Sequence, residues 1–311
     1  MTAVHLSGLS RRHGHWHDLD RLTDDGAVSA ASVAALRRGG LTRYAVFEEP
    51  PSTLYADCLA ETLDRTGLPA ADVDAVLFFS STFSAYDDHA DLAALCARFG
   101  IRDAFPLGMF LGQCTNFSSA LTVAQGLAAT QGLDNVVLLG VDALDDGRAA
   151  RVLPGDVSVF SDTLVTCLLS RRRTDGHLVE RVEHCYRPEL HALHPQRDLL
   201  RYIDGFTGAL GDVVGRLTKS TGRAPEAYAK LVLAHHARPV LRNFAATLGI
   251  PFDRVPTEGI GTLGHCFAYD QLITLSELAE RGETSDGDAL LAIGVGANYL
   301  YSATSFIRCE A

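Results

Sequence analysis

The stretch Cys114-Thr-Asn-Phe-Ser-Ser-Ala-Leu-Thr-Val-Ala-Gln-Gly126 places a reactive thiol at the start of a predicted helix. About half a chain later, Gly264-His265-Cys-Phe-Ala-Tyr-Asp-Gln-Leu-Ile-Thr-Leu275 places an imidazole at the start of another. Each helix is followed by an apolar strand with a glycine, at residues 136–140 and 290–294. The pairing predicts a duplicated fold with its reactive groups at the seam between two halves.

Sliding the sequence against itself by half its 311 residues supports a duplication. Thr66-Gly67 then falls on Thr221-Gly222, and the apolar run 76–79 falls on 231–234. Each half reads as helix, Thr-Gly turn, buried strand, reactive helix and buried strand. Identities are few, so chance alignment is the alternative, but the shared order of elements argues against it.

The predicted strands are continuous apolar runs, which favour a parallel sheet covered by helices on both faces. Strands alternating with helices indicate an α/β layered architecture. We expect an N-terminal half at residues 1–172, which carries the cysteine, and a C-terminal half at 173–311, which carries the histidines. The polar stretch Ser170-Arg-Arg-Arg-Thr-Asp-Gly176 is predicted to join them.

Composition narrows the class of protein. Hydrophobic content of 47% and charged content of 21% are typical of a globular protein. No apolar run approaches the ~20 residues that cross a bilayer, and the N-terminus has no apolar signal core. Seven scattered cysteines fit a reduced cytoplasm, and a net charge of −11 argues against general nucleic-acid binding. We therefore expect a cytoplasmic protein that binds neither nucleic acid nor membrane.

Three positions could do chemistry together. A thiol at a helix N-terminus, such as Cys114, is activated by the unpaired N–H groups and the helix dipole; the alternative is a buried structural cysteine. His235 and His236 follow the strand at 230–234, where α/β proteins place ligands, and one of them is expected to face the site. His265 follows a glycine-rich turn. Satisfied loop histidines are the alternative for these positions.

Other site types are disfavoured. No closely spaced Cys/His quartet supports zinc, and we expect no metal. Asp142 and Asp162 lie near strand ends and could be acid–base groups, although such residues more often cap helices and turns. No dinucleotide or phosphate-binding loop is present, so we expect no cofactor.

Taken together, these features resemble the thiolase-fold condensing enzymes, and most closely the β-ketoacyl-acyl-carrier-protein synthase III type. The resemblance rests on the helix-opening Cys114 and on four further motifs, Gly40-Leu-Thr-Arg43, Ser161-Asp-Thr163, Ala234-His-His-Ala-Arg238 and Ile293-Gly-Val-Gly-Ala-Asn298. It implies a five-layered α-β-α-β-α fold made of two similar halves, usually dimeric. It also implies that His235 is the catalytic histidine, and that His265 stands where the family has asparagine.

The resemblance implies a mechanism. Cys114 would take an acyl group from a thioester, with the N–H groups of Cys114 and of a residue near Ala297 as the oxyanion hole. His235 and His265 would then donate hydrogen bonds to a malonyl thioester during decarboxylative condensation, in specialised lipid or polyketide biosynthesis. Two alternatives stay open: plain transfer of the acyl group to an amine or hydroxyl, and an inactive partner subunit of a heterodimeric synthase.

The resemblance also implies partners. Acyl and malonyl groups would arrive on coenzyme A or on an acyl carrier protein, and Arg238 and Arg242 are the candidates for docking an acidic carrier. A homodimer is expected. The residues predicted to contact substrate are Phe83 and Tyr86, from a loop that this family inserts into the partner's acyl pocket, together with Phe267 and Asn298.

Overall fold

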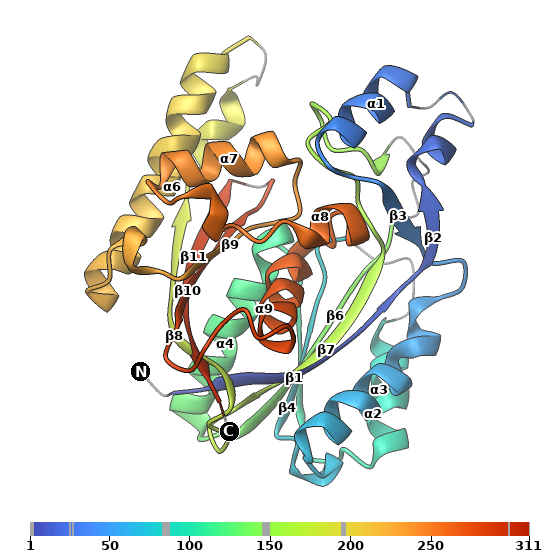
Figure 1. Cartoon of the computed structure of the whole chain (residues 1–311). Coiled ribbons are helices and arrows are strands. Elements are labelled where there is room, and N and C mark those ends of the chain that lie inside the picture. Colours follow the sequence, from blue (N-terminus) through green and yellow to red (C-terminus); the bar gives the residue numbers. More distant parts are fainter. Residues whose placement is uncertain are drawn as a thin grey trace.

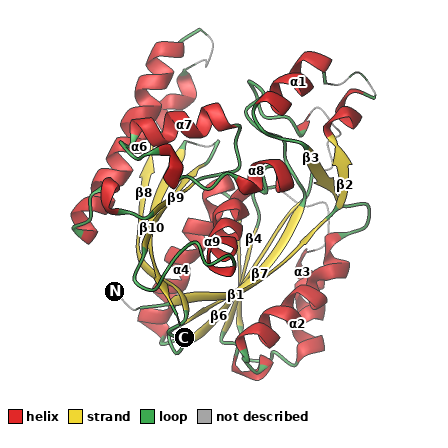
Figure 2. Cartoon of the chain, viewed as in Figure 1, coloured by secondary structure: helices red, strands yellow, loops and turns green. Residues whose placement is uncertain are grey.

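The computed structural model describes residues 3–24, 26, 28–82, 88–144, 150–193, 197–297 and 299–310. Its strands form a nine-stranded sheet in the order β5-β4-β6-β7-β1-β8-β11-β10-β9 and a small sheet of β2 and β3 (Figure 2). The strands are β1 His5–His13, β2 His15–Asp18, β3 Arg43–Val46, β4 Ala75–Phe79, β5 Phe105–Met109, β6 Asn135–Asp142, β7 Thr163–Ser170, β8 Gly176–Tyr186, β9 Lys230–Val232, β10 Ala289–Val295 and β11 Leu300–Cys309.

The helices lie around this sheet. They are α1 Ala30–Arg38, α2 Tyr55–Thr66, α3 Asp88–Phe99, α4 Asn116–Gln131, α6 Leu199–Thr221, α7 Arg238–Thr247, α8 Glu258–Leu263 and α9 Asp270–Glu280, with the short 3-10 helices η4 Gln113–Thr115, η5 Pro188–Ala192 and η8 Phe267–Tyr269 among the connections. Within the described part of the chain, no helix combines the length and the apolar character that a membrane span requires.

The strand pairing confirms the duplication. In the first half β4 pairs parallel with β6, β6 antiparallel with β7, and β7 antiparallel with β1. In the second half β9, β10, β11 and β8 repeat that series of parallel, antiparallel and antiparallel pairs. The halves join where β1 pairs with β8 at only two positions, His5 with Leu178 and Leu6 with His177. The predicted parallel sheet is thus corrected to a mixed one: a continuous apolar strand reports that both faces are covered, whatever its direction.

Five layers are visible in Figure 1, with α4 and α9 between the two halves of the sheet. Three clusters of buried side chains fill the spaces between the layers. One lies under α2 and α3, one surrounds α4 and α9, and one lies under α6 and α7. The expected α-β-α-β-α architecture is confirmed, and it places α4 and α9, the two helices that follow the reactive residues, side by side at the centre.

The ends of two helices match the Thr-Gly turns noted in the sequence. The Thr-Gly turns close α2 and α6, where Gly67 and Gly222 have φ of 62° and 72°, a left-handed conformation that favours glycine.

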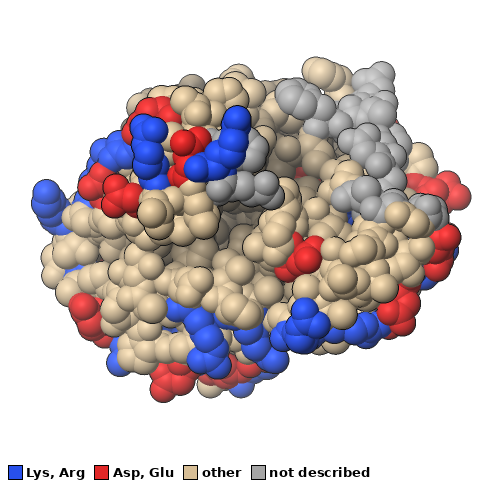
Figure 3. Space-filling model, turned by 90° about the horizontal axis from the view of Figure 1, so that it is seen from above, with Lys and Arg blue, Asp and Glu red and all other residues tan. Residues whose placement is uncertain are grey.

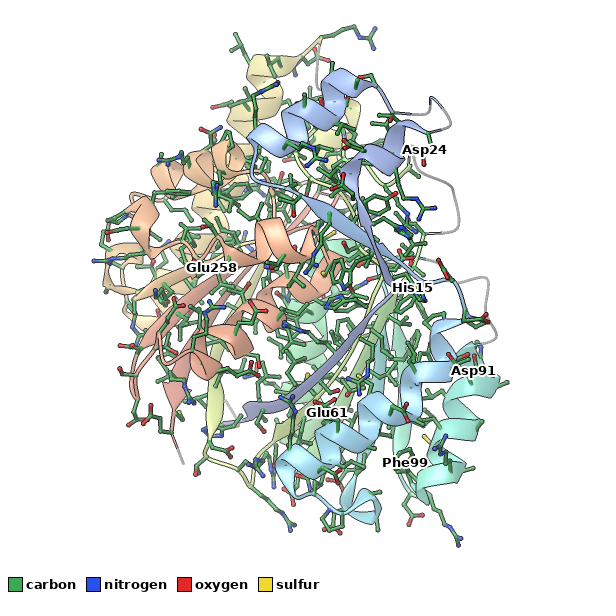
Figure 4. All side chains as sticks on the ribbon, turned by 45° about the vertical axis from the view of Figure 1, so that its right-hand side comes forward. His15, Asp24, Glu61, Asp91, Phe99 and Glu258 are labelled. Carbon is green, nitrogen blue, oxygen red and sulfur yellow. The ribbon has the colours of Figure 1, made fainter. Side chains whose placement is uncertain are left out.

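Figure 4 shows Glu61 on α2 beside β1. Its carboxylate accepts hydrogen bonds from Ser10 and Arg12, both at 2.8 Å. The bond from Arg12 leads the contacts that lower the pKa of Glu61 to about 2.

Candidate active site

Cys114 lies in a strained turn just before α4. Gln113, the residue before it, has φ of 48°, which is uncommon for a residue other than glycine. Asn116 holds the turn: its Oδ1 accepts from the Gly112 N–H at 2.8 Å, and its Nδ2 donates to Ser80 O at 2.5 Å and to Phe110 O at 3.2 Å. These bonds keep an unfavourable backbone conformation in place and leave the Cys114 sulfur half-buried.

The sulfur meets an imidazole that is itself held by a carboxylate. Cys114 Sγ lies 3.6 Å from His265 Nε2, and His265 Nδ1 lies 2.5 Å from Asp270 Oδ2. An ionised carboxylate only accepts, so His265 Nδ1 carries the proton that is donated to Asp270. The Nε2 atom is therefore the one available to exchange a proton with sulfur, which is the arrangement of a nucleophile, a base and an orienting acid.

The backbone at His265 differs from the sequence prediction. We expected a helix to begin at His265, but α9 begins at Asp270. His265 forms an isolated bridge instead: its N–H donates to Val159 O at 2.8 Å, and its carbonyl accepts from Ser161 at 2.9 Å. Phe160 stacks on the His265 ring with centroids 5.0 Å apart. The five-residue offset lets the start of α9 present Asp270 to the side of His265.

Cys114, His265 and Asp270 form a row of contacting side chains, and the charge of each affects the pKa of its neighbour. Burial opposes an imidazolium at His265, but the Asp270 carboxylate and the Cys114 sulfur outweigh it and raise the pKa of His265 to about 10. Burial likewise opposes ionisation of Asp270, yet His235 and His265 hold the pKa of Asp270 well below its usual range. The charged, buried carboxylate therefore stabilises the imidazolium that forms when His265 Nε2 takes the proton of Cys114.

The structure corrects our choice of His235 as the histidine that meets the substrate. Its ring is buried, and both ring nitrogens already have partners. His235 Nδ1 lies 2.9 Å from Gly264 O and 3.1 Å from Asp270 Oδ1, while Nε2 lies 3.0 Å from Thr274 Oγ1. The ring is pressed against Gly259, where a Cβ would come within 2.4 Å of it. No nitrogen is left to bond a thioester.

The neighbouring His236 faces the site instead. It lines a cavity of about 20 Å³ together with Cys114, and its ring meets the His265 ring edge-on, with centroids 5.0 Å apart. Burial, and then the charge of His265, lowers the pKa of His236 to about 3. His236 is therefore neutral at physiological pH and can donate or accept a hydrogen bond in this cavity.

A wider opening lies on the other side of the cysteine turn. It has a volume of about 710 Å³ and is lined mainly by apolar residues, Gly108, Met109, Phe110, Leu111, Gly112, Asn116, Ser119, Tyr186 and Leu300. Two of these, Leu111 and Tyr186, are 82% and 58% exposed. Large exposed apolar side chains around a cavity indicate a surface that is covered by an apolar ligand or a partner.

The remaining predicted contacts separate into three groups. Phe267 is buried and stacks on Phe160 with centroids 4.3 Å apart, so it packs behind His265 and lines neither cavity; the prediction that it contacts substrate is corrected. Ala297 lies in the turn between β10 and β11, and its part in an oxyanion hole stays a prediction. The predicted substrate contacts Phe83, Tyr86 and Asn298 lie outside the described residues.

The two predicted carrier-docking residues are on the surface. Arg238 begins α7 and is exposed, and Arg242, one turn later, stacks over the ring of Phe252 at 4.2 Å. Within the described ranges, neither forms an ion pair with an acid. Figure 3 shows the molecule from above, hollowed near its middle, with Lys and Arg side chains at its rim.

Sequence reasoning missed Asp270. We weighed Asp142, which ends β6, and Asp162, which precedes β7. Asp142 accepts bonds from the turn at 80–82, and Asp162 pairs with the buried Arg151 at 2.7 Å. The signal for Asp270 was its place five residues after His265 at the head of an apolar stripe. Only the three-dimensional turn between them shows that the two side chains meet.

One group of donors could suggest a metal. The ligand atoms of His235, Cys266 and Asp270 lie within 4.8 Å of one another. However, His235 and Asp270 are already engaged in hydrogen bonds, and Asp270 Oδ1 also accepts from the Cys266 N–H at 2.7 Å. Burial raises the pKa of the Cys266 thiol well above its ordinary value, which disfavours a thiolate ligand. The chemistry of these groups fits support of Asp270 better than metal binding.

Comparisons with known proteins find similarity to synthase III proteins. Residues 219–307 match the family model described as 3-oxoacyl-[acyl-carrier-protein] synthase III C terminal. The chain is 27% identical to β-ketoacyl-[acyl-carrier-protein] synthase III 2 of Streptomyces avermitilis, over 95% of this chain and 97% of that one. It is 26% identical to synthase III 4 of Streptomyces coelicolor, over 95% and 96%.

Solved structures share the fold at lower identity. ChlB3, named as an acyltransferase, superposes with a TM-score of 0.84 at 18% identity over 99% of each chain. The synthase III FabH of Pseudomonas aeruginosa superposes with a TM-score of 0.79 at 20% identity, again over 99% of each chain. These comparisons confirm the resemblance to synthase III and the thiolase-like fold.

Proposed function

We propose that this synthase III-like chain is an acyltransferase that takes an acyl group from a thioester onto Cys114 and passes it to a hydroxyl or an amine. The observation that carries the proposal is the row Cys114 Sγ, His265 and Asp270, joined by contacts of 3.6 and 2.5 Å. A nucleophile, a titratable base and an orienting carboxylate in that order are what acyl transfer needs.

The first half-reaction forms the acyl-enzyme. His265 Nε2 accepts the Cys114 proton, and the sulfur attacks the thioester carbonyl. The tetrahedral intermediate collapses with loss of the donor thiol, which receives that proton from His265. In the second half-reaction His265 Nε2 takes the proton of the acceptor O–H or N–H, whose heteroatom attacks the acyl-enzyme. The Cys114 sulfur then leaves and is reprotonated by His265. Neither half-reaction needs a malonyl group or releases CO₂.

Decarboxylative condensation, which we expected first from the sequence, is the second candidate. It is supported by the similarity to proteins named synthase III and by the position of His236 on the Cys114 cavity. It needs two donors aimed at one malonyl carbonyl, and we expected His235 and His265 to provide them. His235 is occupied elsewhere, and His265 Nε2 faces the Cys114 sulfur as a base with Nδ1 held by Asp270, so the geometry supports acyl transfer better. The intact row argues against an inactive partner subunit.

The wide apolar opening beside the cysteine turn is a suitable place for the acyl chain, because its lining includes Gly112 and Asn116, which lie on either side of Cys114 in the chain. We retain coenzyme A or an acyl carrier protein as the acyl donor, with Arg238 and Arg242 as the docking residues for a carrier. We also retain a homodimer, in keeping with β5 at the end of the sheet and Phe105 46% exposed on it. Light scattering tests that assembly.

The test of the function is intact-mass analysis with a panel of acyl thioesters. Wild-type protein is expected to gain one acyl mass that Cys114→Ala does not gain. Adding a hydroxyl or amine acceptor should remove that mass without CO₂ release. Removal that occurs only with a malonyl thioester, together with CO₂, would establish condensation instead.

A further inference from the structure

We propose that His235 is a positioning residue that locks the His265–Asp270 pair from behind, and that it does not touch the substrate. This inference rests on the proposed acyl transfer for its kinetic consequences, but its geometry stands on the hydrogen bonds of His235 alone. The histidine expected to act on substrate would then have a different task in this chain.

The first support concerns the Asp270 carboxylate. Four donors surround it: His265 Nδ1, the Cys266 N–H, the His235 N–H and His235 Nδ1. The His235 backbone N–H donates to Oδ2 at 2.7 Å, and its Nδ1 lies 3.1 Å from Oδ1. His235 thus contacts both oxygens, which fixes the carboxylate plane and keeps Oδ2 directed at His265.

The second support concerns the residue before His265. His235 Nδ1 lies 2.9 Å from Gly264 O. Gly264 has φ of 67° and ψ of −159°, a conformation that is essentially limited to glycine, and a Cβ there would come within 2.9 Å of Val159 O. By binding Gly264 and Asp270, His235 holds the segment that presents His265 at both of its ends.

The tautomer of His235 follows from its partners. Gly264 O and the Asp270 carboxylate can only accept, so Nδ1 carries the proton, and Nε2 accepts from the Thr274 hydroxyl at 3.0 Å. The other titratable groups near Asp270 are His265 and Cys266 in its own segment, His236 after β9, Cys114 in η4 and His13 at the end of β1. Among these contacts, only His235 binds both Gly264 and the carboxylate.

Substitutions at His235 separate positioning from packing. In His235→Asn the amide Nδ2 falls near the place of Nδ1 and keeps the donor. In His235→Gln the amide reaches the place of Nε2 and leaves Gly264 O without its donor, and His235→Ala removes both. His177→Asn is the matched control, because His177 is also buried but lies on β8, where its ring meets the Phe306 ring edge-on.

Three measurements are made on the full-length protein: kcat and KM for acyl transfer, the rate of Cys114 alkylation by iodoacetamide, and the downfield proton NMR signal of His265 Nδ1, assigned by its loss in His265→Gln. Misplacing a catalytic group by about 1 Å lowers the rate by roughly 10²-fold. We expect that fall in kcat for His235→Ala and His235→Gln with KM within twofold, slower alkylation and a displaced NMR signal. His235→Asn should recover most of kcat and the wild-type signal.

The control His177→Asn should lower the melting temperature without changing the NMR signal or alkylation. The inference is overturned if His235→Ala leaves the signal and the alkylation rate as in wild type, or if His235→Asn behaves like His235→Ala in all three readouts. Because alkylation and NMR need no acyl acceptor, they decide the inference even if wild-type protein transfers no acyl group.

Discussion

Replacing Asp270 with asparagine should disable the site while changing only a few atoms. The carboxylate accepts from four donors, two at each oxygen. An amide offers one oxygen, so its NH₂ must face one pair of donors. If the oxygen faces Cys266 and the His235 ring, the NH₂ faces His265 Nδ1. His265 then binds as the other tautomer, with Nε2–H directed at sulfur and unable to take its proton.

The size of the loss follows from that change. Holding the wrong tautomer in a catalytic triad lowers kcat by roughly 10⁴-fold, which corresponds to about 5.5 kcal/mol at 1.36 kcal/mol for each tenfold. The Asp270–His265 contact is short and fully buried, so solvent does not weaken it. We therefore expect acyl-enzyme formation by Asp270→Asn to be between 10²- and 10⁴-fold slower than in wild type.

The assay is single-turnover release of thiol from an acyl thioester, followed with intact-mass detection of the adduct. Asp142→Asn is the control: Asp142 is also buried, and a single amide oxygen can still accept the bonds that its Oδ1 accepts from the turn at 80–82. Wild-type acylation by Asp270→Asn, with the control unchanged, would refute the assignment of Asp270.

Four further predictions use contacts in and around the site. His265→Asn should abolish transfer to an acceptor, because asparagine cannot take a proton, whereas a condensing enzyme would keep part of its CO₂ release; a radiolabelled malonyl donor distinguishes the two. Gly259→Ala should lower both melting temperature and kcat, since its Cβ would lie 2.4 Å from the His235 ring, and calorimetry with kinetics checks this. The pKa of His265 is raised from 6.5 to about 10, so protonated His265 stabilises the folded protein fully below pH 6.5, and this contribution is lost as the pH rises toward 10. Urea titrations should therefore show that the free energy of unfolding of wild type exceeds that of His265→Gln by less and less across that pH range. Asp162→Ala should lower the free energy of unfolding by about 3–5 kcal/mol by stranding the buried Arg151, as measured by urea unfolding.

Much of the fold could be predicted from the sequence, because it depends on patterns within short segments. The two Thr-Gly turns, at Gly67 and Gly222, recur at the same spacing as the apolar runs of β4 and β9. In the structure the turns end α2 and α6, and each of the two strands pairs in parallel with its neighbour, β6 or β10. Strand direction was not readable. Burial on both faces produces the same continuous apolar run in β7, which is antiparallel, as in β4, which is parallel.

The site could be predicted from the sequence only in part. Cys114 and His265 were singled out from the residues around them, and they lie in contact. The choice between His235 and His236 failed because motif alignment fixes backbone position, while side-chain direction depends on Asp270 and Gly264, which are distant in sequence. Local patterns identify reactive residues, but they do not specify which side chains share a proton.

In the proposed reaction, Cys114 transfers its acyl group to an acceptor heteroatom with the help of His265 and Asp270. The most direct measurement is the mass of the acyl-enzyme over time, with an acceptor present and no malonyl thioester, while evolved CO₂ is monitored. We predict that the Cys114 adduct forms, then decays into acylated acceptor with no CO₂. An adduct that persists until malonyl thioester is added, and then disappears with one CO₂ per acyl group, would contradict the claim.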